Sequence, residues 1–267
     1  MIIGVPKEIK AQEHRVALLP SAAYQLIRHG HKVLVESNAG AGIGFGDDNY
    51  AHAGAEIVAS HTEVFERADM IVKVKEPLPE EYGLLKKGQI LFPYLHLAAS
   101  KPLTEALQKT GAICIAHETV RVNNRLPLLE PMSEIAGRMS VQVGAHYLEK
   151  EQGGRGVLLG GVPGVAPAKV AILGVGGLGI QGVKIARMLG AHVTCTDLDD
   201  RKLERARSFG AEHVLNPKRE SFLEASRHRL GSYDVLIDNV GRKETVFEAV
   251  QACRNGGKVV AMGYVDP

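Results

Sequence analysis

Short apolar runs alternate with longer stretches of mixed polarity along almost the whole chain. In the first half, the apolar runs predict strands at Ile2–Val5, Lys32–Glu36, Met70–Lys75, Gln89–Tyr94 and Ala112–Ala116. The stretches between them predict helices, among them Ser21–His29 and Pro102–Thr110. An alternation of strands and helices favours a parallel sheet covered by helices.

A second alternating series follows the stretch EQGGRGVLLGGVPGVAPAK, whose glycines and prolines are typical of a connection between domains. The predicted strands of this series are Lys169–Leu173, His192–Thr196, His213–Leu215, Val235–Asp238 and Lys258–Met262. The predicted helices are Leu178–Leu189, Arg201–Phe209 and Lys243–Cys253. The pattern therefore predicts an α/β protein of two domains, each a mostly parallel sheet flanked by helices.

A long helix is predicted between the two series, from about Ser133 to Lys150. Its apolar residues recur at helical spacing, at Ile135, Met139, Val143 and Tyr147. Ser133 is a candidate N-cap, because its hydroxyl can accept a hydrogen bond from a backbone N–H of the first turn.

Composition and charge exclude several classes of function. Of 267 residues, 45% are apolar and 23% charged, which is typical of a soluble α/β protein. Lysine and arginine number 32 against 30 acidic residues, without a dense basic run, so neither nucleic acid nor a membrane surface is an expected partner. No run is apolar for long enough to span a bilayer, and the N-terminus lacks the features of a signal peptide.

The three cysteines, Cys114, Cys195 and Cys253, each lie in an apolar segment and form no close-spaced pair. We therefore expect buried, reduced thiols. Together with the composition, this favours a cytoplasmic location.

Residues 172–197 carry the pattern of a dinucleotide site. Gly174, Gly176 and Gly179 have GxGxxG spacing, follow a predicted strand and open a predicted helix, and Asp197 ends the next strand. The first glycine permits a tight turn, the second lets a pyrophosphate approach the backbone, and the third lets the helix pack closely. The alternative is a tight turn without a ligand, but the combination favours a nucleotide in a Rossmann-type domain. The candidate cofactor-binding residues here are Gly174, Gly176, Gly177, Leu178, Gly179 and Asp197.

Asp197 favours NAD over NADP, because a carboxylate accepts hydrogen bonds from the ribose 2′-OH and repels a 2′-phosphate. Arg201 and Lys202 lie nearby in the sequence and weaken this preference. From about Ala168 to Gly263 the chain resembles the cofactor domain of medium-chain, zinc-type alcohol dehydrogenases, through GVGGLGIQGVKIARMLGAHVTCTD, YDVLIDNVG and GGKVVAMG. No cluster of cysteine and histidine precedes this stretch, so no metal is expected.

Several blocks of the first half resemble alanine dehydrogenases. They are GVPKEIKAQEHRVALLP at 4–20, VKVKEPLPEEY at 72–82, LFPYLHLA at 91–98, PLLEPMSEIAGRMSVQVGAHYLEK at 127–150 and GGRGVLLGGVPGVAPAKV at 153–170. The blocks keep the order and spacing of that family. The nicotinamide nucleotide transhydrogenase α-subunit shares the ancestry but matches these motifs less closely.

The resemblance implies NAD-dependent oxidative deamination of L-alanine to pyruvate and ammonium, and the reverse reaction. It implies that Arg15 holds the substrate, that Lys75 contacts its carboxylate or carbonyl, and that His96 is the acid/base. It also implies that Ser133 lies near the nucleotide. The residue types agree, because a guanidinium grips a carboxylate through two hydrogen bonds, an ammonium stabilises developing negative charge, and an imidazole exchanges protons near neutral pH.

Each of these residues has a simpler interpretation. Arg15 is then a surface cation, Lys75 a solvated strand end beside Lys73, His96 a hydrogen-bonded structural histidine, and Ser133 only a helix cap. The matched motifs favour the functional interpretation for the first three. For Ser133 the two interpretations stay level.

Two departures from the family are expected to matter. The change in resemblance predicts a chimera, natural or engineered, with its junction near Pro167, and the chain ends at Pro267 without the family's return segment to the first domain. Asp266 falls at about the position of a family acid/base aspartate, but a terminal residue without a role fits equally. The predicted domains are a substrate domain at 1–130, a connecting helix and linker at 131–167 and an NAD-binding domain at 168–267.

The family also implies a homo-oligomer, with a hexamer as the expected size and the long helix from Ser133 as a contact. Two other functions stay open. One is a non-catalytic NAD-binding protein derived from the family, which would bind NADH without turnover. The other is a transhydrogenase-like subunit that exchanges hydride with a partner chain.

Overall fold

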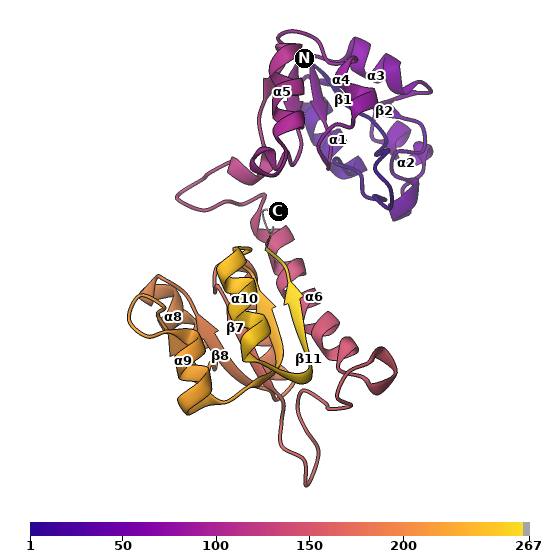
Figure 1. Ribbon diagram of the computed structural model, residues 1–267. Coiled ribbons are helices and arrows are strands. Elements are labelled where there is room, and N and C mark those ends of the chain that lie inside the picture. The colour runs from indigo at the N-terminus through magenta and orange to yellow at the C-terminus, as the bar shows by residue number, and fades with distance from the viewer. Residues whose placement is uncertain (264–267) are drawn as a thin grey trace. The chain divides into compact units, whose positions relative to one another are not determined.

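The computed structural model describes residues 1–263, and the chain forms two compact units, Met1–Leu129 and Glu130–Pro267 (Figure 1). Each unit contains one sheet, and every strand pair within the two sheets is parallel. Helices flank each sheet. The predicted α/β class with two parallel-sheet domains is therefore confirmed.

The first unit has six strands in the order β3-β2-β1-β4-β5-β6. They are β1 (Ile2–Val5), β2 (Lys32–Glu36), β3 (Glu56–Val58), β4 (Met70–Val72), β5 (Ile90–Phe92) and β6 (Ile113–Cys114). The helices are α1 (Pro20–Arg28), α2 (Asp47–His52), α3 (His61–Arg67), α4 (Pro79–Tyr82) and α5 (Lys101–Thr110). The winding direction reverses between β1 and β4, and ligands of open α/β sheets bind beyond the carboxyl ends of the strands at such a point.

Local chemistry sets the ends of α5. The Ser100 hydroxyl accepts a hydrogen bond from the backbone N–H of Leu103 at 3.3 Å, which satisfies one donor of the first turn. Gly111 ends the helix in the left-handed region, with φ 69°, where glycine carries no steric cost. Leu103 and Leu107 form the buried face.

Up to residue 263, the second unit has five strands in the order β11-β10-β7-β8-β9. They are β7 (Lys169–Leu173), β8 (His192–Thr196), β9 (His213–Leu215), β10 (Tyr233–Asp238) and β11 (Cys253–Ala261). The helices are α6 (Glu130–Tyr147), α7 (Gly177–Met188), α8 (Asp200–Ser208), α9 (Phe222–Ala225) and α10 (Lys243–Ala252). All residues of β10 are buried, as expected for an apolar strand with neighbours on both sides. The winding reverses between β7 and β10, so the glycine stretch after β7 stands at that point.

Helix α6 differs from its prediction in two ways. It begins at Glu130, so Ser133 lies within the helix, and the N-cap interpretation of Ser133 is wrong. Its large apolar residues Ile135, Met139 and Tyr147 are exposed, whereas Gly137 and Gly144 are buried. A Cβ on Gly137 would lie 2.1 Å from the Leu178 carbonyl oxygen, so the close approach of α6 to α7 requires the absence of a side chain there.

The cysteines agree only in part with the prediction. Cys195 is buried, whereas Cys114 and Cys253 are partly exposed, and all three are free thiols. Burial raises the pKa of each thiol. Within residues 1–263, no helix has the length and apolar character needed to cross a membrane.

Candidate active site

Arg15 lies in the loop between β1 and α1, where it pairs with Glu13. Its Nε and Nη2 donate to the two carboxylate oxygens of Glu13, at 2.8 and 2.6 Å, and its backbone N–H donates to Oε1 at 3.0 Å. The hydrogen bond from the Arg15 side chain lowers the pKa of Glu13 to about 2. Both groups are therefore charged at neutral pH, and the side chain of Arg15 remains 44% exposed.

Lys75 lies three residues beyond β4, in the loop that leaves its carboxyl end. The backbone N–H groups of Val74 and Lys75 donate to Glu8 Oε1, at 2.6 and 3.4 Å. The positive charge of Lys75 contributes to the lowered pKa of Glu13, after the hydrogen bonds and charge of Arg15. Arg15 and Lys75, which belong to separate sequence motifs, therefore both act electrostatically on the carboxylate of Glu13.

His96 lies four residues beyond β5, in a left-handed backbone conformation with φ 50° and ψ 40°. Its exposed imidazole stacks on the ring of Tyr94, with ring centres 6.1 Å apart and an interplanar angle of 23°. Burial raises the pKa of Tyr94, and the positive charge of Arg15 opposes this rise. Tyr94 therefore stacks on His96 and is also close enough to Arg15 to be affected by its charge.

All three predicted substrate residues thus lie in loops that leave the carboxyl ends of β1, β4 and β5 within the first unit. The loops of β1 and β4 flank the reversal point of the sheet. This arrangement places a guanidinium, an ammonium and an imidazole on the edge where open α/β sheets hold their ligands.

A group of charged side chains around the buried Lys73 was missed from the sequence. Lys73 is 1% exposed, and its Nζ lies 2.5 Å from Glu81 and 3.6 Å from Glu8. His61 lies 2.7 Å from Glu36 and 3.2 Å from Glu81, and hydrogen bonds to these two carboxylates raise the pKa of His61 to about 9. Glu8, Lys73 and Glu81 are buried, whereas Glu36 and His61 are partly exposed. The available signal was the lysine inside the apolar run MIVKV.

The glycine loop of the second unit has the geometry that its spacing predicts. Gly174 has φ 83°, and Gly176 is the N-cap residue of α7. A Cβ on Gly179 would lie 2.1 Å from the Gly174 carbonyl oxygen, whereas a Cβ on Gly176 would meet no atom of residues 1–263 within 4 Å. Ser133 lies beside this loop, because its Cβ would be 3.8 Å from a Cβ on Gly177.

Asp197 stands one residue beyond β8 and binds the same loop. One carboxylate oxygen accepts the backbone N–H of Val175 and the other that of Asp199, each at 3.0 Å. The Nζ of Lys202 lies 3.7 Å away. Asn239, which the sequence did not single out, donates from Nδ2 to the Gly174 carbonyl oxygen at 3.0 Å, and its buried Oδ1 has no hydrogen-bond partner within the described part of the chain.

These features fit a dinucleotide. The open space at Gly176 adjoins the first N–H groups of α7, a geometry that suits an anion, and Asp197 stands at the usual position of a ribose acceptor. Among residues 1–263, no three histidine, cysteine, aspartate or glutamate side chains gather where they would hold a metal ion. Asp266 lies outside the described residues.

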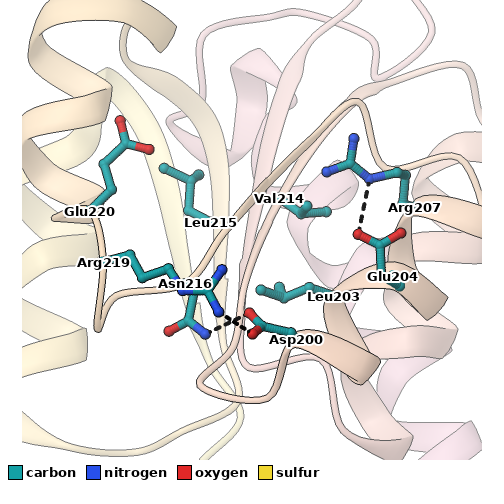
Figure 2. A pocket seen from close by; sticks show the side chains of 9 residues that line it. All are labelled: Asp200, Leu203, Glu204, Arg207, Val214, Leu215, Asn216, Arg219 and Glu220. Atoms are coloured by element: carbon teal, nitrogen blue, oxygen red, sulfur yellow. Dashed lines mark hydrogen bonds and ion pairs between the residues drawn. The ribbon is translucent and has the colours of Figure 1, made fainter.

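A shallow pocket of about 350 Å³ lies between α8 and β9, beyond Asp197 (Figure 2). Figure 2 shows Asp200 facing Asn216 and Arg219, and the ion pair between Asp200 and Arg219 measures 2.5 Å. The charges of Asp200 and Arg219 in this pocket therefore already compensate one another. None of the predicted site residues that the structure describes lines this pocket.

The fold and the two residue groups define a class of protein: an α/β protein with a dinucleotide-type second unit and charged side chains in the loops at one edge of the first sheet. Two family models match the chain, "Alanine dehydrogenase/PNT, N-terminal domain" at residues 4–136 and "Alanine dehydrogenase/PNT, C-terminal domain" at residues 140–242. The chain belongs to the alanine dehydrogenase/PNT family.

Individual relatives agree with this assignment. The chain is similar to an alanine dehydrogenase of Methanococcus maripaludis, 56% identical over 204 residues, which are 76% of this chain and 55% of that protein. It is 47% identical over 267 residues to alanine dehydrogenase 2 of Staphylococcus aureus strain USA300, covering 97% of this chain and 71% of the relative. A solved L-alanine dehydrogenase structure has a TM-score of 0.82 at 45% identity, over 98% of this chain and 73% of that chain. The chain thus spans about half the length of the first of these relatives.

The comparisons correct the prediction of a chimera. The C-terminal family model runs from 140 to 242 without a break at Pro167, and the Staphylococcus aureus relative aligns with 97% of the chain. The nucleotide half therefore belongs to the same family as the first half. The glycine loop and following strands are shared by many dinucleotide folds, because the same turn and pyrophosphate geometry is required in each.

Proposed function

We propose that the chain catalyses the NAD-dependent oxidative deamination of L-alanine to pyruvate and ammonium, and the reverse reductive amination. The observation that carries this proposal is the grouping of Arg15, Lys75 and His96 at one edge of the first sheet. The names of the relatives support the same reaction. A 2-oxo acid presents a carboxylate, a carbonyl and a site of proton exchange, and the three side chains supply one complementary group for each.

In this proposal Arg15 binds the substrate carboxylate, with its guanidinium held in orientation by Glu13. The ammonium of Lys75 donates to the substrate oxygen and stabilises the negative charge that develops there. His96 gives and takes the protons that are exchanged when ammonia adds and water leaves. Bound NAD supplies the acceptor or donor of the hydride.

The test is the absorbance of NADH at 340 nm with pyruvate and ammonium, beside a control without ammonium. The proposed reaction consumes NADH only when both substrates are present. A protein that binds NADH but shows no pyruvate- and ammonium-dependent oxidation would be a non-catalytic member of the family, and the proposal would fail.

We propose NAD as the cofactor rather than NADP. The support is Asp197, whose carboxylate lies beyond β8 with both oxygens accepting backbone N–H groups. A 2′-phosphate beside this negative charge would be repelled, although Lys202 at 3.7 Å reduces the repulsion. Fluorescence titrations with NADH and NADPH would decide the point, and equal or tighter binding of NADPH would overturn it.

Two glycine variants are expected to separate cofactor binding from stability. Gly176→Ala places a methyl group in the open space at the start of α7, so we expect at least about tenfold weaker NADH binding with little change in Tm. Gly179→Ala drives its methyl group into the Gly174 carbonyl oxygen, so we expect a lower Tm as well. Titration of NADH fluorescence and thermal unfolding measure the two effects. Unchanged NADH binding in Gly176→Ala would contradict a pyrophosphate at this loop.

We also propose a cytoplasmic homo-oligomer, a hexamer in its expected form. The support for assembly is the exposed apolar row Ile135, Met139 and Tyr147 on α6, because apolar side chains of this size are commonly covered in assemblies. Three free cysteines fit a reducing compartment. Light scattering would show a monomeric mass if the assembly proposal is wrong.

A further inference from the structure

Glu118 belongs to the 3₁₀ turn η3 (His117–Thr119) after β6, but its carboxylate reaches the turn that carries His96. Oε1 accepts the backbone N–H of His96 at 2.7 Å, and both carboxylate oxygens lie 3.2 Å from the backbone nitrogen of Leu95. Strands β5 and β6 are neighbours in the sheet, so the loops that follow them leave the same edge. One side chain thus ties the two loops together at His96.

His96 is a residue whose backbone needs such a restraint. Its φ of 50° places the backbone of His96 in the left-handed region, which is unfavourable for a residue with a Cβ. Such a conformation persists only where surrounding contacts hold it. The following residues Leu97–Ala99 form the 3₁₀ turn η2, so the conformation of His96 also sets the direction in which the chain continues. Without the carboxylate, two backbone donors at this turn lose their protein acceptor.

We propose that Glu118 is the positioning residue of His96. Its carboxylate holds the left-handed turn and thereby presents the imidazole beside Tyr94, at the edge where Arg15 and Lys75 lie. The inference rests on the proposed function, in which His96 transfers protons. The Glu118 carboxylate accepts hydrogen bonds from the backbone N–H groups of Leu95 and His96, so it affects the reaction by fixing the position of the imidazole.

The same unit contains a matched control. Asn38, in the loop after β2, also has a left-handed backbone with φ 63°, and its N–H donates to Asp47 Oδ1 at 2.7 Å. The kind of contact, its length and the backbone conformation match those of His96 and Glu118. Asp47→Ala therefore removes an equivalent restraint at a loop that carries none of the proposed substrate residues.

The experiment compares Glu118→Ala, Glu118→Gln and Asp47→Ala with the wild type at equal folded fraction. We expect Glu118→Ala to lower kcat by at least about tenfold, because small misplacements of a catalytic group are costly, while KM for pyruvate changes by less than about twofold. Glu118→Gln should recover most of the activity, because its carboxamide oxygen still accepts the two N–H groups. Asp47→Ala should leave kcat unchanged.

Amide hydrogen exchange of the peptide containing Leu95 and His96 provides a readout that does not depend on turnover. We expect exchange to be at least about tenfold faster in Glu118→Ala and unchanged in Asp47→Ala, because only the former loses the acceptor at this turn. Unchanged exchange in Glu118→Ala would overturn the inference, as would faster exchange with unchanged kcat, or a Glu118→Gln variant as impaired as Glu118→Ala. An inactive wild type would overturn the proposed function and the catalytic purpose of this contact, while exchange would still decide whether Glu118 holds the turn.

Discussion

Replacing His96 with asparagine is expected to lower kcat for NADH oxidation with pyruvate and ammonium by about 10²–10⁴-fold, the usual contribution of a positioned acid/base. Asparagine is chosen because it tolerates the left-handed conformation that His96 adopts, with φ 50°. The backbone of the turn is then kept and the imidazole alone is lost. Alanine at this position would mix the loss of the imidazole with backbone strain.

Stopped-flow or steady-state absorbance at 340 nm measures the loss, and an NADH titration shows whether the nucleotide site is intact. We expect the NADH dissociation constant to stay within about twofold, because the proposed cofactor-binding residues belong to the second unit. His14→Asn is the control, since His14 is an exposed histidine next to Arg15 without a proposed role. If His96→Asn keeps more than about a tenth of the wild-type kcat, His96 is not the acid/base.

Much of the fold follows from local patterns. The strands β1, β2, β7, β8 and β9 have the bounds that their apolar runs predict. When a strand is buried on both faces, its apolar run must lie inside the sheet, so the flanking turn residues leave little choice of where the strand begins and ends. Strand β3, by contrast, has three residues and begins at Glu56, which is too short and too polar to produce a periodic signal.

Helix α6 shows where periodicity indicates a helix but not its buried face. The spacing of Ile135, Met139 and Tyr147 correctly indicates a helix, yet these side chains are exposed. The buried face is made of small residues such as Gly137, because the backbone of α7 approaches too closely for a larger one. The buried face of α6 thus depends on how closely α7 approaches it. That distance cannot be predicted from the sequence of α6 alone.

The proposed substrate residues were singled out through motifs, whereas the carboxylates that bind the backbone at two of them were not. Glu8 binds the backbone before Lys75 from 66 residues away, and Glu118 binds the backbone of His96 from 22 residues away. Such contacts depend on which loops the sheet order brings together, and no local spacing encodes them. Lys73 and Lys75 make the same point: they lie two residues apart, yet Lys73 is buried in an ion pair and Lys75 is partly exposed in the loop after β4.

Replacing Lys73 with methionine is expected to destabilise the first unit by about 3–5 kcal/mol at pH 7, because breaking a buried ion pair leaves its partners uncompensated. The Nζ of Lys73 lies 2.5 Å from Glu81 and 3.6 Å from Glu8, and all three side chains are almost fully buried. Methionine has a similar length and volume, so the loss is mainly one of charge rather than of packing.

The pKa values of Glu8 and Glu81 determine how the loss of stability in Lys73→Met changes with pH. Burial raises the pKa of Glu8, whereas the pKa of Glu81 is low because His61 and Lys73 together outweigh the effect of its burial. Removing Lys73 removes a cation that lowers both pKa values, so both rise in the folded state. A carboxyl group whose folded pKa exceeds its unfolded pKa costs stability at higher pH and regains it as the pH falls. The deficit of Lys73→Met should therefore shrink between pH 7 and pH 5.

Urea unfolding followed by circular dichroism at the two pH values measures the deficit. Lys101→Met is the matched control, because Lys101 is 87% exposed and its ion pair with Glu105 spans 3.7 Å. An exposed pair of this kind contributes about 0–1 kcal/mol, so the control should unfold almost as the wild type does. A deficit below about 1 kcal/mol at pH 7 would mean that the Lys73 ion pair contributes no more than a surface pair. A deficit that grows at pH 5 would mean that the carboxyl groups left behind are not the source of the cost, since their protonation should relieve it.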